Sequence, residues 1–419
     1  MQANPEPANP PPGGGRSFAA FSYPAFRAQF TSFVLAMMAD NIEHVISYWM
    51  VFQKFQSPAL GGFAVLSHWL PFLLFSVAAG VLADRFDSRK IIQCGMALFM
   101  LVSVGWGYFF ITDTLTITAA MVLLVLHGCA GVLWVIPNQL LLYDIVGPAH
   151  LQSAVRLNAT ARYLGVLVGP GIGGVIMLWL GPSWGIFLNA AFYLPTLLWL
   201  FVAPKRQQIA GASRVAMRGL RDVLDTIREI AKRPILISMT LLAGLTSLMI
   251  GNAYHAQMPG FAHDLGHGDP GMSYSMLLAA DALGAMVAGV ALETWARLRP
   301  RAGIAIALAI CWSAALLGFA ATGNYTVALI LLFAAGFFEL SFSAMAQTLV
   351  QINAPLDMRG RVVGLFNMSA LGLRAFGGVT VGLFGQAFGI HWSLGASAAI
   401  LIGLLPLLFQ LAPPKSASL

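Results

Sequence analysis

The sequence contains few charged residues. Only 9% of its 419 residues are Asp, Glu, Lys or Arg, whereas 58% are hydrophobic, and the mean hydropathy is +0.78. Soluble domains carry about a quarter charged residues, so this composition excludes an ordinary soluble enzyme. A membrane-spanning helix needs about 20 apolar residues. The sequence predicts an all-α integral membrane protein with twelve spans, at 28–50, 60–83, 91–111, 116–142, 153–180, 184–203, 235–258, 272–293, 302–322, 325–350, 361–388 and 392–411.

Cysteines and catalytic motifs are also scarce. Cys94, Cys129 and Cys311 lie in predicted spans and form no CxxC pair, which predicts neither a disulfide framework nor a zinc site. The motifs HExxH, GxSxG and GxxxxGK[ST] are absent, so neither an enzyme nor ATP-driven transport is indicated. We expect no cofactor, the lipid bilayer and a small-molecule substrate as partners, no nucleic acid, and a monomer.

The placement of the basic residues explains the net charge of +7. When both termini are cytoplasmic, every Lys and Arg except Lys54 and Arg374 lies on the inner side or at an inner helix end. This asymmetry follows the positive-inside rule. We therefore expect a multi-pass protein of the bacterial inner membrane with both termini in the cytoplasm, and no nucleic-acid partner.

A polar stretch at 204–234 separates six predicted spans from the other six. Its apolar residues recur at helical spacing, which predicts an amphipathic helix along the inner membrane face; a solvated linker is the alternative. The expected organisation is a disordered tail, an N-terminal six-helix bundle, this linker, a C-terminal bundle and a second tail, at 1–17, 18–203, 204–234, 235–412 and 413–419.

An internal repeat relates the two halves. A shift of 209 residues brings Asn158 onto Asn367, and the run 80–84 onto 289–293. It also brings Gly169 and Gly173 onto other glycines, Gly378 and Gly382. Parallel repeats of this kind are typical of transporters whose substrate site lies near mid-membrane between the halves. The sequence thus predicts two pseudo-symmetric bundles.

A charged turn joins the second and third spans. It contains Asp84, Arg85, Arg89 and Lys90 after Gly80. Asp84 ends a span, where its carboxylate can accept hydrogen bonds from the N-terminus of a neighbouring helix. Such contacts would hold the inner helix ends together in one state and release them in another. The alternative is that these charges only fix the membrane orientation.

The run Gly80-x-Leu82-Ala-Asp84-Arg85-x-x-x-Arg89-Lys90 resembles the signature loop of the major facilitator superfamily of secondary transporters. Asp87 stands where a Gly is usual, which is similar to the exporter branch that includes enterobactin and macrolide efflux proteins. The run from Pro355 to Arg361 also resembles this branch. The resemblance covers nearly the whole chain and implies alternating access between two six-helix bundles.

Small residues in the fifth span form a further motif. Gly169, Pro170, Gly173 and Gly174 resemble the antiporter motif of the superfamily. Small residues allow two helices to approach closely, and a proline loosens the backbone ladder. The motif favours antiporter-type export. The alternative is a packing seam that says nothing about the direction of transport.

Ionisable residues inside spans are functional candidates because burying a charge in a bilayer is costly. Asp40, Glu43 and His44 share one helix face through their i, i+3 and i+4 spacing. They could carry a transported proton, or Glu43 and His44 could sit at the outer water boundary. Three further residues are candidates for ion coupling: Asp281, Glu339 and Arg374. Glu339 and Arg374 could instead form a structural ion pair, and Asp281 could be the partner of Arg374.

The resemblance implies that the first, fourth, seventh and tenth helices line the cavity. It would place there His127, Trp134, Asn138 and Gln139 with Asn252, Tyr254, His255 and Gln257. We expect proton-coupled export of a siderophore-like or drug-like organic molecule. Two alternatives stay open: a metal or metal-siderophore carrier with Asp40, His44 and His255 as ligands, and a transporter-like sensor that binds without transport.

Overall fold

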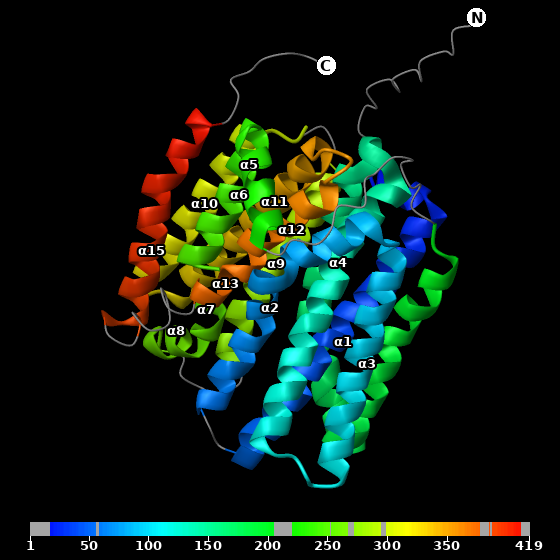
Figure 1. Cartoon of the computed structure of the whole chain (residues 1–419). Helices are drawn as coiled ribbons and strands as arrows, with labels where there is room; N and C mark the ends of the chain where they lie inside the picture. Colours follow the sequence, from blue (N-terminus) through cyan, green and yellow to red (C-terminus); the bar gives the residue numbers. More distant parts are fainter. Residues whose placement is uncertain are drawn as a thin grey trace, which may run out of the picture.

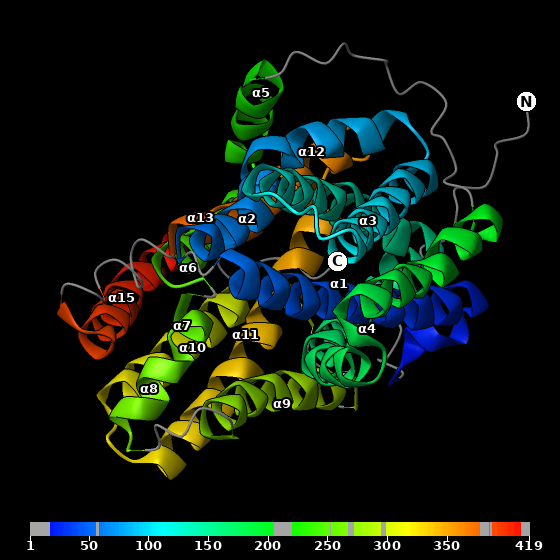
Figure 2. The same ribbon diagram turned by 90° about the horizontal axis from the view of Figure 1, so that it is seen from below.

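The computed structural model describes residues 17–55, 58–204, 220–251, 253–266, 272–294, 299–377, 385 and 388–411. Within these residues the chain is helical and has no strand, as the sequence predicts (Figure 1). Seen along the bundle, α1, α3 and α4 lie on one side, and α8, α10 and α15 lie on the other (Figure 2). The expected all-α class is confirmed.

The first half contains one short and four long elements. They are η1 (Ala19–Ser22), α1 (Pro24–Phe55), α2 (Pro58–Arg85), α3 (Ser88–Ile111) and α4 (Ile117–Val202). Helix α4 is three helices in series, because Gly147 and Gly181 have φ of +67° and +73°. Each glycine precedes a proline, and the residue before a proline disfavours helical geometry. The two breaks reproduce the predicted fourth, fifth and sixth spans.

The second half begins with the amphipathic helix α5 and contains more interruptions. Its elements are α5 (Leu220–Ala231), α6 (Pro234–Met249), α7 (Ala253–Ala256), α8 (Met258–Asp264), α9 (Met272–Thr294), α10 (Ala302–Ala321), α11 (Tyr325–Asn353), α12 (Arg359–Asn367), η2 (Met368–Gly372), α13 (Arg374–Gly377), α15 (Ile390–Leu404) and η4 (Leu405–Gln410). The predicted span 235–258 corresponds to a candidate span at Pro234–His255, but its helix is interrupted: α6 ends at Met249, and Gly251 has a φ of +52°. The predicted span 361–388 contains a π-helical turn, η2. Residues 1–16 and 413–419 of the predicted tails and residues 205–219 of the predicted linker lie outside the described residues.

The outer surface of the bundle suits lipid. Eight described helices are long and apolar enough to cross a membrane, and α4 is one of them. Helix α1 is not among the eight, since Asp40, Glu43 and His44 lower its hydropathy. Large apolar side chains such as Leu178 and Trp179, each 85% exposed, lie on the outside, where water would oppose them.

The halves approach each other through glycines. Gly360, Gly364 and Gly372 on α12 and η2 face α2, and a Cβ on Gly364 would lie 3.0 Å from the Cα of Val77. Helix α2 of the first half is therefore in close backbone contact with α12 and η2 of the second half. We call the end of the bundle where η1 and η4 lie the terminal end (Figure 1).

Candidate functional site

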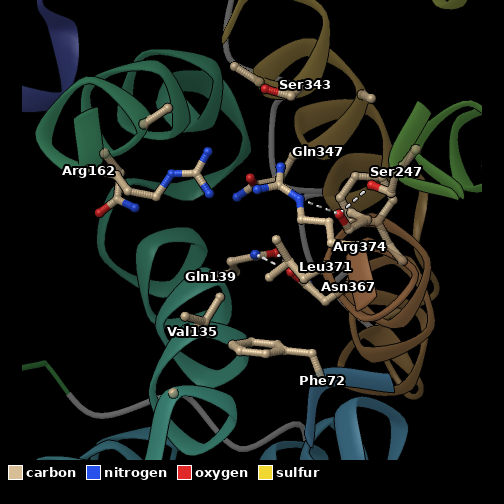
Figure 3. Close-up of a pocket in the computed structure, with 18 of the residues that line it drawn as sticks. Phe72, Val135, Gln139, Arg162, Ser247, Ser343, Gln347, Asn367, Leu371 and Arg374 are labelled. Atoms are coloured by element: carbon tan, nitrogen blue, oxygen red, sulfur yellow. Dashed lines mark hydrogen bonds between the residues drawn. The ribbon is translucent and has the colours of Figure 1, made fainter. Parts of the chain in front are cut away.

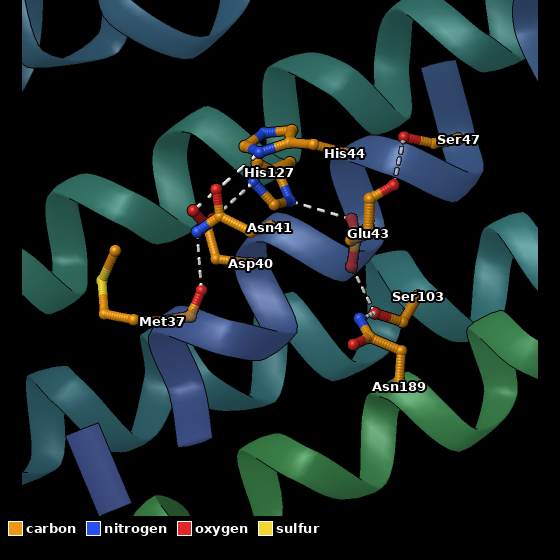
Figure 4. Close-up of polar contacts among 9 residues, drawn as sticks. All are labelled: Met37, Asp40, Asn41, Glu43, His44, Ser47, Ser103, His127 and Asn189. Atoms are coloured by element: carbon orange, nitrogen blue, oxygen red, sulfur yellow. Dashed lines mark hydrogen bonds and ion pairs between the residues drawn. The ribbon is translucent and has the colours of Figure 1, made fainter. Parts of the chain in front are cut away.

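Three side chains of the first half form a hydrogen-bonded triad (Figure 4). His127 of α4 stands between the two carboxylates of α1: its Nε2 lies 3.0 Å from Asp40 Oδ1, and its Nδ1 lies 2.8 Å from Glu43 Oε1. The spacing of Asp40 and Glu43, one helical turn apart, lets one imidazole reach both. The triad is buried, with Glu43 only 1% exposed. The alternative that placed Glu43 at the water boundary is wrong.

Neighbouring polar groups complete the triad. Ser103 of α3 donates its Oγ hydrogen to Glu43 Oε2, and Asn189 of α4 donates to Ser103 at 3.4 Å. The triad therefore draws on α1, α3 and two segments of α4. A buried carboxylate with a hydrogen bond to each of its two oxygens keeps one orientation, which holds His127 in place.

Counting protons shows what the triad can hold. A carboxylate oxygen only accepts, and a neutral imidazole has one N–H. Two imidazole–carboxylate hydrogen bonds need two protons, so the triad holds one proton more than neutral His127 with ionised Asp40 and Glu43. The geometry therefore accommodates an imidazole protonated on both nitrogens between two carboxylates.

A glycine seam fixes α1 against α4. Gly165, Gly169 and Gly173 recur every fourth residue, and a Cβ on Gly169 would lie 2.7 Å from Asn41 Cβ. This contact sits beside Asp40 and sets the approach of its helix to α4. Of the predicted antiporter motif, Gly169 and Gly173 belong to the seam, whereas a Cβ on Gly174 would meet nothing within 4 Å. The geometry supports the interpretation of the motif as a packing seam. Its role in antiporter-type export stays a prediction.

Two more histidines gather beside the triad. One ring nitrogen each from His44, His68 and His127 lies within 4.8 Å of the other two. His44 Nδ1 is 3.9 Å from Asp40 Oδ2, and the buried Nδ1 of His68 has no hydrogen-bond partner among the described residues. These groups come from three different helices, α1, α2 and α4.

A cavity lies between the two halves beside this cluster (Figure 3). Its walls are mostly aromatic and apolar, with a few amides and charges. Residues of the first half that line it are Phe33, Met37, Asp40, His68, Trp69, Phe72, Phe99, Gly131, Trp134, Val135, Asn138, Gln139, Val155, Asn158, Ala159 and Arg162. Residues of the second half are Ala243, Thr246, Ser247, Gly251, Trp312, Glu339, Phe342, Ser343, Ala344, Ala346, Gln347, Phe366, Asn367, Ala370, Leu371 and Arg374.

The cavity includes part of the predicted set. Trp134, Asn138 and Gln139 line it, as expected from the resemblance. Tyr254, His255 and Gln257 are not among its lining residues, because the break at Gly251 ends α6 and carries the chain away from the helix axis. Asn252 lies outside the described residues.

The other residues predicted for ion coupling lie in two separate pairs. Arg374 Nη2 lies 3.6 Å from Glu339 Oε1. Asp281 instead meets the displaced segment: its Oδ1 accepts from Tyr254 Oη at 3.2 Å, and its Oδ2 lies 3.2 Å from His255 Nε2. The structure therefore favours the Glu339–Arg374 pair over a pair between Asp281 and Arg374. Their predicted roles in ion coupling remain predictions.

Side-chain amides of Gln139, Asn367 and Gln351 form hydrogen bonds beside the cavity, and we call this group the amide lock. Gln139 Nε2 donates to Asn367 Oδ1 at 3.0 Å, and Asn367 Nδ2 returns a hydrogen bond to Gln139 Oε1 at 3.2 Å. Gln351 adds a longer contact of 3.4 Å to the same oxygen. This reciprocal pairing joins α4 of one half to α12 of the other.

At the terminal end, Asp84 caps the helix of the opposite half. Its two oxygens accept from the backbone N–H groups of Gly360 at 2.6 Å and Arg361 at 3.0 Å, which begin α12. The contact expected at a helix N-terminus is present. The predicted function of this contact as a gate is not tested by its geometry.

The rest of the charged turn stays within its own half. Asp87 is the N-cap of α3 and accepts from the backbone and guanidinium of Arg89. These hydrogen bonds hold the pKa of the Asp87 carboxyl below its usual range. Arg89 also donates to the carbonyl of Ala203 at 2.8 Å. The Asp that replaces the usual Gly thus serves as a cap.

The repeat partner of Asp84 has an equivalent contact. Glu293, at the end of α9, accepts from the backbone N–H of Phe18 at 3.1 Å and from Ser153 Oγ at 2.7 Å. Arg156 donates to the carbonyl of Leu292 at 2.6 Å. Each half therefore ends a helix with a carboxylate that binds backbone N–H groups of the other half. Arg297, near this site in sequence, lies outside the described residues.

Sequence reasoning missed His68 and Arg162. Both lie inside predicted spans, which is the signal that could have identified them. Arg162 was counted with the inner helix ends, but it lies several turns inside α4 and lines the cavity. His68 stands one residue before Trp69 in an otherwise apolar helix.

Two helical bundles around a shared central cavity define a transporter of the major facilitator superfamily. The chain belongs to the transmembrane secretion effector family, whose sequence profile matches residues 15–418. It is therefore a multi-pass inner-membrane transporter and not an enzyme.

Named relatives cover nearly the whole chain. The chain is 23% identical to the enterobactin exporter EntS of Shigella boydii serotype 4 (strain Sb227) over 406 residues, which cover 94% of this chain and 95% of the relative. It is 24% identical to EntS of Salmonella choleraesuis (strain SC-B67), which covers 94% and 96% of the two chains.

Solved structures share the fold. The human organic anion transporter MFSD10 (TETRAN) has a TM-score of 0.72 at 16% identity, over 93% of this chain and 99% of that one. The E. coli fucose:proton symporter FucP has a TM-score of 0.69 at 14% identity, over 93% and 98%. At these identities the likeness concerns the fold alone.

Proposed function

We propose that the protein is a secondary active transporter that exports a small organic molecule in exchange for protons. One observation carries this proposal: His127 bridges Glu43 to Asp40, and Asp40 lines the cavity between the halves. Asp40 belongs both to the proton site and to the cavity. A molecule that approaches Asp40 therefore competes with His127 for its oxygens, which links proton occupancy to substrate occupancy.

Alternating access follows from the contacts at the terminal end. With both termini cytoplasmic, the described conformation is closed on the cytoplasmic side by the Asp84 cap, the Glu293 contact and the amide lock. Each of these is a noncovalent contact between halves, so a rocking motion can break all three together. Proton release from the triad would accompany the cytoplasm-facing state, where substrate enters.

The nature of the cargo follows from the walls and the relatives. Aromatic rings with a few amides suit a bulky amphipathic molecule. The relatives are named enterobactin exporters, which supports a siderophore-like compound. The proton gradient supplies the driving force, so we propose no cofactor, and we propose a monomer in the lipid bilayer.

Transport into inverted membrane vesicles with an imposed pH gradient tests the proposal, with enterobactin and ethidium as probes. We expect gradient-dependent uptake of at least one probe. Asp40→Asn keeps the side-chain shape and should abolish the gradient dependence while insertion and folding stay normal. Absence of gradient-dependent movement of either probe by folded protein would reject the proposal. Binding without movement would favour a sensor.

The histidine cluster favours a second candidate function, transport of a divalent metal. Zinc and nickel prefer imidazole nitrogen, and His44, His68 and His127 offer three within 4.8 Å of one another beside Asp40. His255 lies with Asp281 instead and is not part of this set. Titration calorimetry with Zn²⁺ and Ni²⁺ decides: stoichiometric binding that His68→Ala removes would support a metal cargo, and no binding would exclude it.

A further inference from the structure

One of the charged side chains that line the cavity has no direct partner of opposite charge among the described residues. Apart from His68, four ionisable side chains face it: Asp40, Arg162, Glu339 and Arg374. Asp40 is bound by His127, and Glu339 lies 3.6 Å from Arg374. This leaves Arg162. Within the described part of the chain, its guanidinium makes no hydrogen bond or ion pair and lies 5.3 Å from the ring centre of Tyr163.

An arginine stays charged at any physiological pH. A guanidinium without a counter-charge inside a membrane protein is costly and marks a ligand or ion pathway. The polar atoms of Arg162 are not sealed in the protein interior, since it is partly exposed in the cavity wall. The missing counter-charge is therefore best supplied by something that enters the cavity.

A second cation faces the same space. Arg162 projects from α4 toward Arg374 and Gln347 of the opposite half (Figure 3). Arg374 is steered by its own contacts: Nε donates to the Ala370 carbonyl at 3.1 Å, and its Cζ lies 5.2 Å from the ring centre of Trp69. An anionic group between the two guanidinium groups would relieve their mutual repulsion and touch both halves.

The walls around these cations are aromatic. Trp69, Phe72 and Trp134 line the cavity from the first half, and Trp312 and Phe342 line it from the second. Rings of this size bind flat apolar bodies by stacking and edge contacts. The two features together describe one ligand, in which an aromatic body carries a negative group.

We propose that Arg162 and Arg374 bind the anionic group of an aromatic organic acid, while the aromatic side chains hold its ring. This inference rests on the proposed transport function and names the substrate class. Binding at both arginines would draw Arg374 toward the ligand and away from Glu339. The occupied site would thereby join the halves across the cavity.

Two probes of equal shape test the proposal: 2-naphthoate, which is charged, and 2-naphthamide, which is not. Calorimetric titration of the full chain in lipid nanodiscs should show about tenfold tighter binding of 2-naphthoate or more, the worth of one charge-assisted hydrogen bond. Arg162→Gln should remove this preference and leave 2-naphthamide binding unchanged. Arg162→Lys should keep part of it.

Arg27→Gln is the matched control, because Arg27 is exposed on α1 and does not line the cavity. It should keep the full preference. Equal binding of both probes by the unaltered protein, no binding of either, or an undiminished preference in Arg162→Gln would each overturn the anion site. If the unaltered protein prefers 2-naphthoate but shows no gradient-driven transport, the proposed proton coupling alone is overturned.

Discussion

The two halves carry their buried charges in different ways. In the first half, His127 bonds to two carboxylates at 3.0 and 2.8 Å, and Ser103 bonds to one of them. In the cavity wall of the second half, Glu339 and Arg374 share a single contact of 3.6 Å, while His255 and Asp281 pair at 3.2 Å away from the cavity. Imidazole and carboxylate groups can exchange protons, whereas arginine stays charged. The difference favours proton exchange in the first half and charge recognition in the second.

The largest expected effect comes from breaking the triad. His127→Ala leaves the buried carboxylate of Glu43 without its main partner, which costs about 3–5 kcal/mol. We expect a large fall in the thermal unfolding temperature of the purified protein, and loss of gradient-driven transport. The double variant Glu43→Gln/His127→Ala buries no unpaired charge at position 43 and should recover part of the stability. An unchanged unfolding temperature in His127→Ala would show that the triad is not a tightly bound unit.

The glycine seam offers a way to move α1 without touching its charges. Gly169→Ala places a Cβ 2.7 Å from Asn41 Cβ; overpacking costs about 1–3 kcal/mol, partly offset by the better helix propensity of alanine. Gly174→Ala is the control, since its Cβ meets nothing within 4 Å. We expect Gly169→Ala to reduce proton-coupled transport but not 2-naphthoate binding. Equal unfolding temperatures for the two variants would contradict the seam.

Glu339→Gln tests the contrast between the halves at the charged pair of the second half. It removes the competing carboxylate from Arg374, so we expect 2-naphthoate to bind about 3- to 10-fold more tightly, or about 1 kcal/mol. Transport should still depend on the pH gradient, because the triad is intact. If instead the gradient dependence disappears, Glu339 belongs to the proton pathway and the division of tasks between the halves is wrong.

The smallest effect is expected at the terminal end. Asp84→Asn weakens the cap of α12, which is worth about 1 kcal/mol, and shifts the closed state toward opening about fivefold. A maleimide should label a cysteine placed at Val77, which is buried against α12, correspondingly faster in a background without Cys94, Cys129 and Cys311. Asp87→Asn is the control, since Asp87 bonds within its own half. Normal transport and unchanged labelling in Asp84→Asn would remove the case for a gate.

Much of the fold could be predicted because lipid imposes simple rules on composition. The contact of Asp84 could also be predicted, because a carboxylate at a helix end can accept hydrogen bonds from the backbone N–H groups of a neighbouring helix N-terminus. The break in the seventh span was not. Gly251 stands in an apolar run, and only the folded chain shows that it takes a positive φ.

The proposed proton and anion sites were harder to foresee. The helical spacing of Asp40 and Glu43 predicts that they share one helix face. His127 and His68 come close to them from other helices, and no spacing within one sequence predicts that contact. The same limit applies to Asp281, whose partner proved to be His255. Local periodicity reports one helix face, while a site between helices depends on packing.

The π-helical turn from Met368 to Gly372 directs the side chain that follows it. A one-residue change of register turns a helical side chain by about 100° around the axis. In an uninterrupted α-helix, Arg374 would therefore point away from Glu339 and Trp69. The wider turn acts as a rotational offset: it aims one cation into the cavity while the helix before it, α12, keeps its glycines against α2. Removing a single residue from this turn would leave the composition of the span nearly unchanged and turn the cation away from its present contacts with Glu339 and Trp69.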